Sequence, residues 1–376
     1  MAEYKTLVKK ISISPDKKTK QRDYLKKGQL AIVDQGQCIV GGYTNDTSMS
    51  VKCNLPVIVF GDHTRAVKYI TFPFGAGADG IKILQPNENI LPLYLYYGTQ
   101  YVVAKMPNRG YARHYQYVER EDLPVPPLSE QERIVARIEE LFSQLDAGVE
   151  TLKKIKAQLA VYRQAVLKEA FESVIPESDT CNVEDVCKDI KVGIVIKPAQ
   201  YYTSADVGVR AFRSANVREF AVNDSDWVYL TKAGHEANLR SEIHTGDVLV
   251  VRSGYPGTAC VVPPTYNGCN AIDILIAVPY AEKILPEYLC AYTNSPLGKR
   301  IIQEKKRGVA QAHFNVSGYS KTPIIVPCLE TQKRVVAEID SRLSVCDSIE
   351  QTVDTALQQA EAMRQSILKD AFEGRL

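Results

Sequence analysis

Apolar residues recur every seven positions along two long segments of the chain. In the first segment the repeated positions are Ile138, Leu145, Leu152, Leu159 and Val166. In the second segment they are Ile339, Cys346, Val353, Ala360 and Ile367. A seven-residue period is typical of the contact seam of a coiled coil. The pattern therefore predicts two long helices, each with an apolar seam along its length.

The two seams differ in the size of their side chains. Further apolar residues lie at intermediate positions: Ile134, Leu141, Ile155 and Tyr162 in the first segment, and Ile349, Ala356 and Met363 in the second. Larger residues in one seam and smaller ones in the other favour packing of the two helices on each other. In the alternative interpretation, each segment is a surface helix on a globule of its own.

The start of the first helix is marked by local chemistry. Ser129 and Glu132 have the spacing of a capping box, and the prolines just before them prevent an earlier start. We expect helices over residues 129–172 and 329–376. A helix of about 44 residues is ~66 Å long at 1.5 Å per residue, which is a rod and not an ordinary core element.

The second segment is a copy of the first, displaced by a constant offset along the chain. The matching residues are Pro126, Leu128, Gln131, Arg133, Val135, Ala136 and Ile138 with Pro327, Leu329, Gln332, Arg334, Val336, Ala337 and Ile339, and Arg163, Gln164, Leu167, Phe171 and Glu172 with Arg364, Gln365, Leu368, Phe372 and Glu373. A long match without a gap indicates continuous helix, because loops tolerate changes of length and helices do not.

The repeat extends weakly into the regions before each helix. Ile90–Leu95 resembles Ile284–Leu289, and the Arg109-Gly110 pair resembles Arg307-Gly308. The chain is therefore interpreted as two half-molecules, each a globular domain followed by a helix. The expected boundaries are 1–128, 129–172, 173–328 and 329–376.

Each globular domain is expected to be α+β. Apolar, β-branched runs bounded by Gly, Pro, Asn or Asp predict strands at 55–60, 81–84, 247–251 and 271–278. Short helices are expected after Pro92 and Pro286. Between the matching anchors the two domains share almost no residues, so one scaffold carries two different surfaces.

Composition excludes several classes of protein. The chain is 45% hydrophobic and 24% charged, and no apolar run approaches the ~20 residues of a membrane span, so we expect a cytoplasmic protein without a signal peptide. The 9 cysteines are scattered and lack metal-site spacing, which indicates reduced thiols. The net charge is only +2, but basic residues outnumber acidic ones within residues 1–128. This permits a polyanionic partner.

The helix entries and exits resemble the repeated helical regions of specificity subunits from Type I restriction-modification systems. The residues that carry the resemblance are Pro126-Pro127-Leu128-Ser129-Glu130-Gln131-Glu132-Arg133, the heptad helix, and Leu368-Lys369-Asp370-Ala371-Phe372-Glu373-Gly374. The stretch from Phe60 to Arg65, with Gly77 to Gly80, is also similar to one variety of first recognition domain.

The resemblance implies a fold and a function. Two target-recognition domains would be separated by two long antiparallel coiled-coil helices. The helices would bind two methyltransferase (modification) subunits, and restriction (nuclease-translocase) subunits would join the complex. Residues Gln131, Arg133, Gln332, Arg334, Phe171 and Phe372 are the expected contacts with partner subunits.

No enzyme motif is evident in the sequence. Gly75, Gly77 and Gly80 have dinucleotide-loop spacing, but a strand is expected after them where that loop requires a helix. No P-loop lysine, nuclease carboxylate pair or methyltransferase signature is present, and the 5 histidines lack metal spacing. We therefore expect a non-catalytic adaptor without cofactor or metal.

Reading double-stranded DNA requires forked donors for base edges and cations for phosphates. The candidates are His63, Arg65, Lys68, Arg109 and Arg113 in the first domain, and Arg213, Asn216, Arg252, Ser253, Arg307, Gln311 and His313 in the second. Surface salt bridges or capped turns would explain each candidate equally well. Reading residues should differ between the domains, which favours Arg65 and Arg252 over the repeated Arg-Gly positions.

Two different DNA-binding domains held apart by long helices predict a DNA site that has two parts and is not palindromic. Half-sites about ten base pairs apart lie ~34 Å apart on one face of the duplex, which helices of the expected length can span. Three alternatives stay open at this point: a coiled-coil scaffold that binds no DNA, a stand-alone enzyme, and the specificity subunit of a Type II-like system.

Overall fold

The computed structural model describes residues 1–376 except 78–79, 108–109, 111, 176–177 and 308–313. The chain divides into two compact units. The first unit comprises residues 1–153 and 354–376, and the second comprises residues 154–353. Each unit is therefore a globular part that packs on one portion of each long helix, α4 (Leu128–Glu172) and α10 (Leu329–Phe372).

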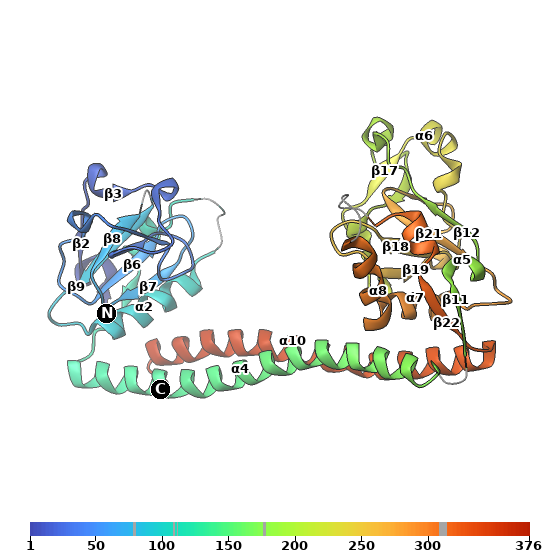
Figure 1. Ribbon diagram of the computed structural model, residues 1–376. Coiled ribbons are helices and arrows are strands. Elements are labelled where there is room, and N and C mark those ends of the chain that lie inside the picture. The colour runs from blue at the N-terminus through green and yellow to red at the C-terminus, as the bar shows by residue number, and fades with distance from the viewer. Residues whose placement is uncertain (78–79, 108–109, 111, 176–177, 308–313) are drawn as a thin grey trace. The chain divides into compact units, whose positions relative to one another are not determined.

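The globular part of the first unit contains two four-stranded sheets (Figure 1). The antiparallel sheet has the order β2-β9-β6-β7, with β2 (Val8–Ile11), β9 (Ile81–Pro86), β6 (Val57–Gly61) and β7 (Val67–Ile70). The mixed sheet has the order β3-β8-β4-β5, with β3 (Lys18–Thr19), β8 (Phe74–Gly77), β4 (Leu30–Val33) and β5 (Gly42–Thr44). A strand pair of β1 (Ala2–Glu3) and β10 (Asp122–Leu123) joins the two ends of this region.

One core connects the antiparallel sheet of the first unit to both long helices. The helix α2 (Pro92–Lys105) supplies Tyr94, whose ring centroid lies 4.9 Å from that of Phe372 at the end of α10. Ile138, on the first part of α4, is fully buried in the same cluster. The α2 helix begins at Pro92 because proline has no N–H to leave unpaired in a first turn.

The second unit repeats the antiparallel sheet of the first unit, whereas its other sheet differs in strand order and strand direction. Its antiparallel sheet has the order β12-β21-β18-β19, with β12 (Cys187–Val192), β21 (Ile274–Pro279), β18 (Val248–Val251) and β19 (Ala259–Val261). Its second sheet has the order β13-β17-β14-β20, with β13 (Tyr202–Thr203), β17 (Val228–Leu230), β14 (Val209–Phe212) and β20 (Asn270–Ala271). A further pair, β11 (Asp179–Asn182) with β22 (Pro323–Val326), corresponds to the β1–β10 pair.

The helices of the second unit also follow the first. The α7 helix (Pro286–Asn294) begins at a proline like α2 and is followed by α8 (Pro296–Arg307). Phe171, at the end of α4, makes edge-on contacts with Tyr288 and Tyr292 of α7, at centroid distances of 5.2 and 5.1 Å. Each unit thus buries the end of one long helix and the beginning of the other.

The two long helices pack antiparallel within each unit. In the second unit, Lys156, Arg163 and Glu169 of α4 pair with Glu350, Asp347 and Arg342 of α10, so the residue number falls on one helix as it rises on the other. In the first unit Asp146 pairs with Arg364, and Arg133 donates to the backbone oxygen of Leu376 at 3.0 Å. The α+β class and the two long helices packed on each other are as the sequence predicts, and their antiparallel direction is as the family resemblance implies.

The seam agrees with the sequence at its repeated positions and less well between them. Ile138, Leu159 and Val166 are buried on α4, as are the small residues Cys346 and Val353 on α10. The intermediate residues Tyr162, Ile349 and Met363 are 45%, 40% and 55% exposed. The packed stripe is therefore narrower than the apolar pattern suggests.

Candidate nucleic-acid interface

The two antiparallel sheets carry different loops at the same position. Residues 62–66 connect β6 to β7, and residues 252–258 connect β18 to β19, which occupy equivalent places in the sheet orders. Each loop is fixed to the segment before the last small helix of its unit. His114 N–H donates to Asp62 O at 2.9 Å, and Phe314 N–H donates to Arg252 O at 3.1 Å. The loops share a framework and differ in length and residues.

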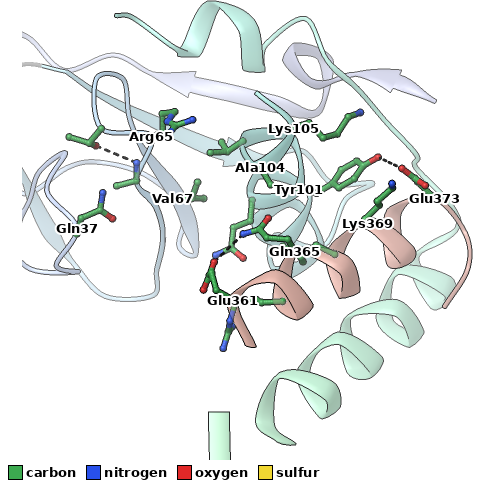
Figure 2. A pocket seen from close by; sticks show the side chains of 16 residues that line it. Gln37, Arg65, Val67, Tyr101, Ala104, Lys105, Glu361, Gln365, Lys369 and Glu373 are labelled. Atoms are coloured by element: carbon green, nitrogen blue, oxygen red, sulfur yellow. Dashed lines mark hydrogen bonds between the residues drawn. The ribbon is translucent and has the colours of Figure 1, made fainter. Parts of the chain in front are cut away.

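The first loop presents Arg65 from a left-handed turn. Arg65 has a φ of 58°, and its Nη1 donates to Met106 O at 3.4 Å. Its neighbour His63 contacts Ala112 O through Nδ1 at 3.2 Å. Figure 2 shows Arg65 and Lys105 at one side of a pocket, with Glu361 and Lys369 of α10 at the other. The pocket mixes both signs of charge, and Arg65 is the half-buried cation that the loop directs into it.

Lys68 lies inside the domain, contrary to its expected role in DNA binding. Its side chain is 3% exposed, and Nζ donates to Asp34 O at 2.7 Å with the Asp34 carboxylate 3.6 Å away. Burial lowers the pKa of Lys68, while Asp34 opposes that shift. The lysine therefore ties β7 to the residues after β4 and does not face a ligand.

In the second loop, the predicted DNA contacts Arg252 and Ser253 are bound to a carboxylate of the same unit. Arg252 is 16% exposed and pairs with Asp273 at 3.2 Å, and Ser253 Oγ donates to the same carboxylate at 3.4 Å. Arg252 therefore acts as a brace in this conformation. The neighbouring Tyr255, which is not among the residues predicted from the sequence to contact DNA, is 86% exposed. The Gly-Tyr-Pro-Gly run around it was an available signal for an exposed turn.

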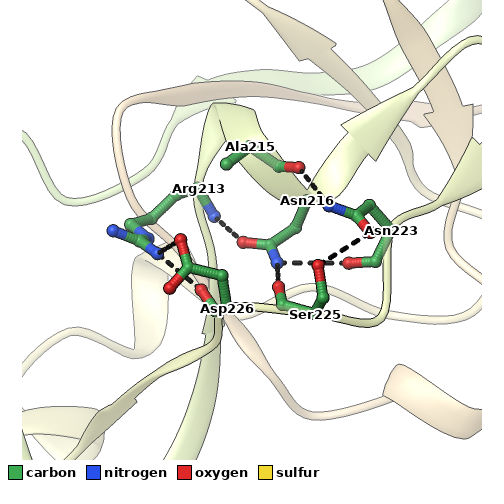
Figure 3. A network of polar contacts seen from close by, with 6 residues as sticks. All are labelled: Arg213, Ala215, Asn216, Asn223, Ser225 and Asp226. Carbon is green, nitrogen blue, oxygen red and sulfur yellow. Dashed lines mark hydrogen bonds and ion pairs between the residues drawn. The ribbon is translucent and has the colours of Figure 1, made fainter. Parts of the chain in front are cut away.

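Arg213 and Asn216 belong to a polar network within the second unit (Figure 3). Asn216 is fully buried; its Oδ1 accepts from Arg213 N–H at 3.0 Å and its Nδ2 donates to Ser225 O at 2.8 Å. The Arg213 guanidinium pairs with Asp226 at 3.0 Å. Asn216 therefore holds a loop together, and only the partly exposed Arg213 stays a candidate for DNA contact.

Of the remaining predicted DNA contacts, the structure describes the side chain of Arg113. Arg113 is exposed in the segment before α3 (Tyr115–Val118). Arg109, Gln311 and His313 lie outside the described residues, and the side chain of Arg307, the last residue of α8, is not described either. Their roles stay predictions.

The two repeated glutamines are internal clamps. Gln131 Oε1 accepts from Leu91 N–H at 2.8 Å, and its Nε2 donates to Pro126 O at 2.8 Å and Asn89 O at 3.1 Å. Gln332 makes the same contacts with Leu285, Pro327 and Lys283, each at 2.9 Å. Both side chains are fully buried, so they fasten each long helix to the globular part before it.

The other predicted subunit contacts divide by exposure. Phe171 and Phe372 are 0% and 5% exposed and fill the cores of their own units. Arg133 and Arg334 are exposed, and Arg133 forms a forked pair with Glu130 at 2.7 and 2.9 Å. The surface available to a partner at the helix beginnings therefore includes the two arginines and excludes the buried glutamines and phenylalanines.

Neither metal nor membrane features are found in the described part of the chain. No group of three or more His, Cys, Asp or Glu side chains there is placed to hold a metal ion. No helix among those residues is long and apolar enough to cross a membrane. Gly75 and Gly77 lie on β8, and β9 begins directly after Gly80, so the glycine-rich stretch leads into a strand as the sequence predicts.

The fold is similar to that of solved specificity subunits. One similar chain comes from a structure of the type I R-M system described by its complex assembly and conformational transition. The match covers 100% of this chain and 97% of that chain, with a TM-score of 0.72 and 17% identity. The HsdS subunit from Thermoanaerobacter tengcongensis covers 100% of this chain with a TM-score of 0.53 and 17% identity, and 96% of it is covered. No family model matches the sequence.

The curated proteins that this chain resembles in sequence are described as specificity subunits of Type I restriction enzymes. The Type I restriction enzyme EcoBI specificity subunit of Escherichia coli is 27% identical over 282 residues, which is 68% of this chain and 58% of that protein. The EcoR124I/EcoR124II specificity subunit, also from Escherichia coli, is 24% identical over 352 residues, or 88% of this chain and 83% of that protein. This chain is a relative of the Type I specificity subunits. It spans 58% of the length of the EcoBI and EcoKI specificity subunits.

Proposed function

We propose that this chain is a non-catalytic DNA-specificity subunit that reads a two-part, asymmetric site. One observation carries the proposal: two sheets of the same strand order hold unlike loops, 62–66 and 252–258, at the same position. A shared scaffold with different loops is suited to reading two different half-sequences. The readers would be the globular regions 1–128 and 173–328.

The long helices would recruit the catalytic partners. Arg133 and Arg334 are exposed at matching positions near the beginnings of α4 and α10. Matching surfaces suit two copies of one methyltransferase subunit, since identical partners require similar contacts. Nuclease-translocase subunits would join that complex. Substitution of both arginines by glutamate should then weaken assembly and leave the fold unchanged.

Salt dependence of binding tests the proposal. The chain would be co-purified with the methyltransferase encoded beside it, and its affinity for duplex DNA measured by fluorescence anisotropy over a series of salt concentrations. Each neutralised phosphate should contribute about −0.9 to the slope of log affinity against log salt. A complex that forms but binds no DNA at any salt concentration, and is not retained on heparin, would instead be a coiled-coil scaffold. Catalysis by the purified chain alone would contradict the adaptor role.

A further inference from the structure

Tyr255 is the most exposed aromatic side chain among the described residues. It lies in the loop between β18 and β19, and 86% of its surface is accessible. The chain has 21 tyrosines, and the other exposed ones in the described part of the chain, Tyr162 and Tyr202, are 45% and 39% accessible. An exposed tyrosine ring offers a large surface with both apolar and hydrogen-bonding character for contact with another molecule.

The backbone on either side of Tyr255 is fixed by short-range contacts. Gly254 and Gly257 have φ values of 78° and 89°, a conformation that other residues rarely adopt. Val251 N–H donates to Thr258 O at 2.8 Å, and Gly257 N–H donates to Val251 O at 3.0 Å. Thr258 N–H donates to Tyr255 O at 3.3 Å. The turn is therefore closed beneath an exposed ring.

The base of the loop is also braced against neighbouring elements. Asp273 receives Arg252 at 3.2 Å and Ser253 at 3.4 Å. A Cβ atom added to Gly257 would lie 3.0 Å from Ile302 of α8, so this glycine lets the loop approach the helix closely. A tyrosine ring held on such a base makes contacts at a low cost in conformational entropy.

A groove beside Tyr255 supplies donors for nucleic acid. Its polar lining includes Ser214, Arg218, Glu219, Lys299 and Gln303, and Tyr255 and Pro256 line it too. Arg218 and Gln303 are exposed, while Lys299 pairs with Glu219. Cations beside an aromatic ring are the combination that binds phosphates and bases together.

The comparison with the first unit favours DNA over a protein partner. Two copies of one methyltransferase would require similar loops in both units, yet loop 62–66 contains no Phe, Tyr or Trp and is shorter than loop 252–258. Two different half-sites require different loops. We propose that Tyr255 determines specificity by contacting base edges in a groove of the half-site read by the second domain. This inference rests on the proposed function.

The test compares sequence motifs selected by variant complexes. Complexes of the full chain with its methyltransferase, carrying Tyr255→Ala, Tyr255→Phe or Tyr202→Ala, would select bound duplexes from a random pool. Tyr202 is a matched control because it is an exposed tyrosine of the same unit that does not line the groove. Tyr255→Ala should lose discrimination at positions of one half-site by about 5- to 100-fold, the range for one mismatched base pair in a specific site. Tyr255→Phe and Tyr202→Ala should keep the wild-type motif.

Each other outcome has a definite meaning. If the wild-type complex selects a motif that Tyr255→Ala leaves unchanged, the inference is wrong and the proposed function stands. If Tyr255→Ala prevents assembly with the methyltransferase, as followed by gel filtration, the loop is a protein contact and the inference is also wrong. If the wild-type complex selects no motif, the proposed function fails and the role of Tyr255 fails with it.

Discussion

Replacing Gln332 by alanine separates an internal clamp from a contact with a partner subunit. The side chain makes three hydrogen bonds to backbone groups of Leu285, Lys283 and Pro327, and it is fully buried. At about 1 kcal/mol net for each bond, the variant should lose about 3 kcal/mol of unfolding free energy, and more if the freed groups stay dry. Lost contacts of this kind are local, so the effect should appear in the second unit.

The single tryptophan makes this measurement specific to that unit. Trp227 packs edge-on against Phe212 at 4.8 Å within the second unit, so its fluorescence reports unfolding there. The urea midpoint detected by Trp227 should fall for Gln332→Ala. Gln131→Ala removes the equivalent three bonds in the first unit and is the matched control. It should move the Trp227 transition much less.

A nearly isosteric change adds a dependence on pH. Gln332→Glu keeps an acceptor for the Leu285 N–H but places a carboxylate against two carbonyl oxygens. Burial should raise the pKa of that carboxyl in the folded state, so the variant is most stable at low pH and loses stability as the pH rises through the raised value. If Gln332→Ala leaves the Trp227 unfolding transition unchanged but abolishes methyltransferase binding, Gln332 does not act as an internal clamp. It would then be a contact with the partner subunit.

Three further predictions concern the same unit. Phe171→Ala should cost about 3–5 kcal/mol by the same fluorescence assay, whereas truncation of Phe220, 36% exposed, should cost under ~1 kcal/mol; equal effects would contradict the packing of α4 on this unit. A double-mutant cycle on Arg163 and Asp347, 2.7 Å apart, should give about 0.2–1 kcal/mol of coupling that weakens in high salt, and a salt-independent value would contradict an exposed pair. Burial raises the pKa of Asp247 in the folded state, so the protonated side chain contributes stability below the ordinary aspartate pKa, and this contribution is lost as the pH rises through the folded-state pKa. Asp247→Asn should therefore gain stability relative to wild type as the pH rises through this range. Parallel profiles of unfolding free energy against pH would contradict this prediction.

The helices could be predicted because their information is local and repeated. A seven-residue period and an ungapped repeat specify a helix and its seam without reference to distant residues. The strands at 81–84 and 247–251 were visible for a similar reason, since β9 (Ile81–Pro86) and β18 (Val248–Val251) are short apolar runs bounded by turn residues. The pattern did not show that Tyr162 and Met363 are exposed, because the width of the seam depends on the partner helix.

The candidate site was harder to predict because a charge in the sequence does not reveal its partner in space. Arg252 pairs with Asp273 and Lys68 pairs with Asp34, and neither partner is a neighbour in the sequence. Asn216 looked like a base reader and is the centre of a buried network. Solvent exposure distinguishes residues that could contact DNA from residues with a structural role. Tertiary packing determines that exposure.

The sequence of the DNA selected by the wild-type complex tests the central claim most directly. The chain would be purified with the methyltransferase encoded beside it, and duplexes bound at moderate salt would be recovered from a random pool and sequenced. Two unlike loops on one scaffold predict an asymmetric motif in two parts with a constant gap. A single continuous motif, a palindrome, or no enrichment by a fully assembled complex would contradict the claim that each unit reads its own half-site.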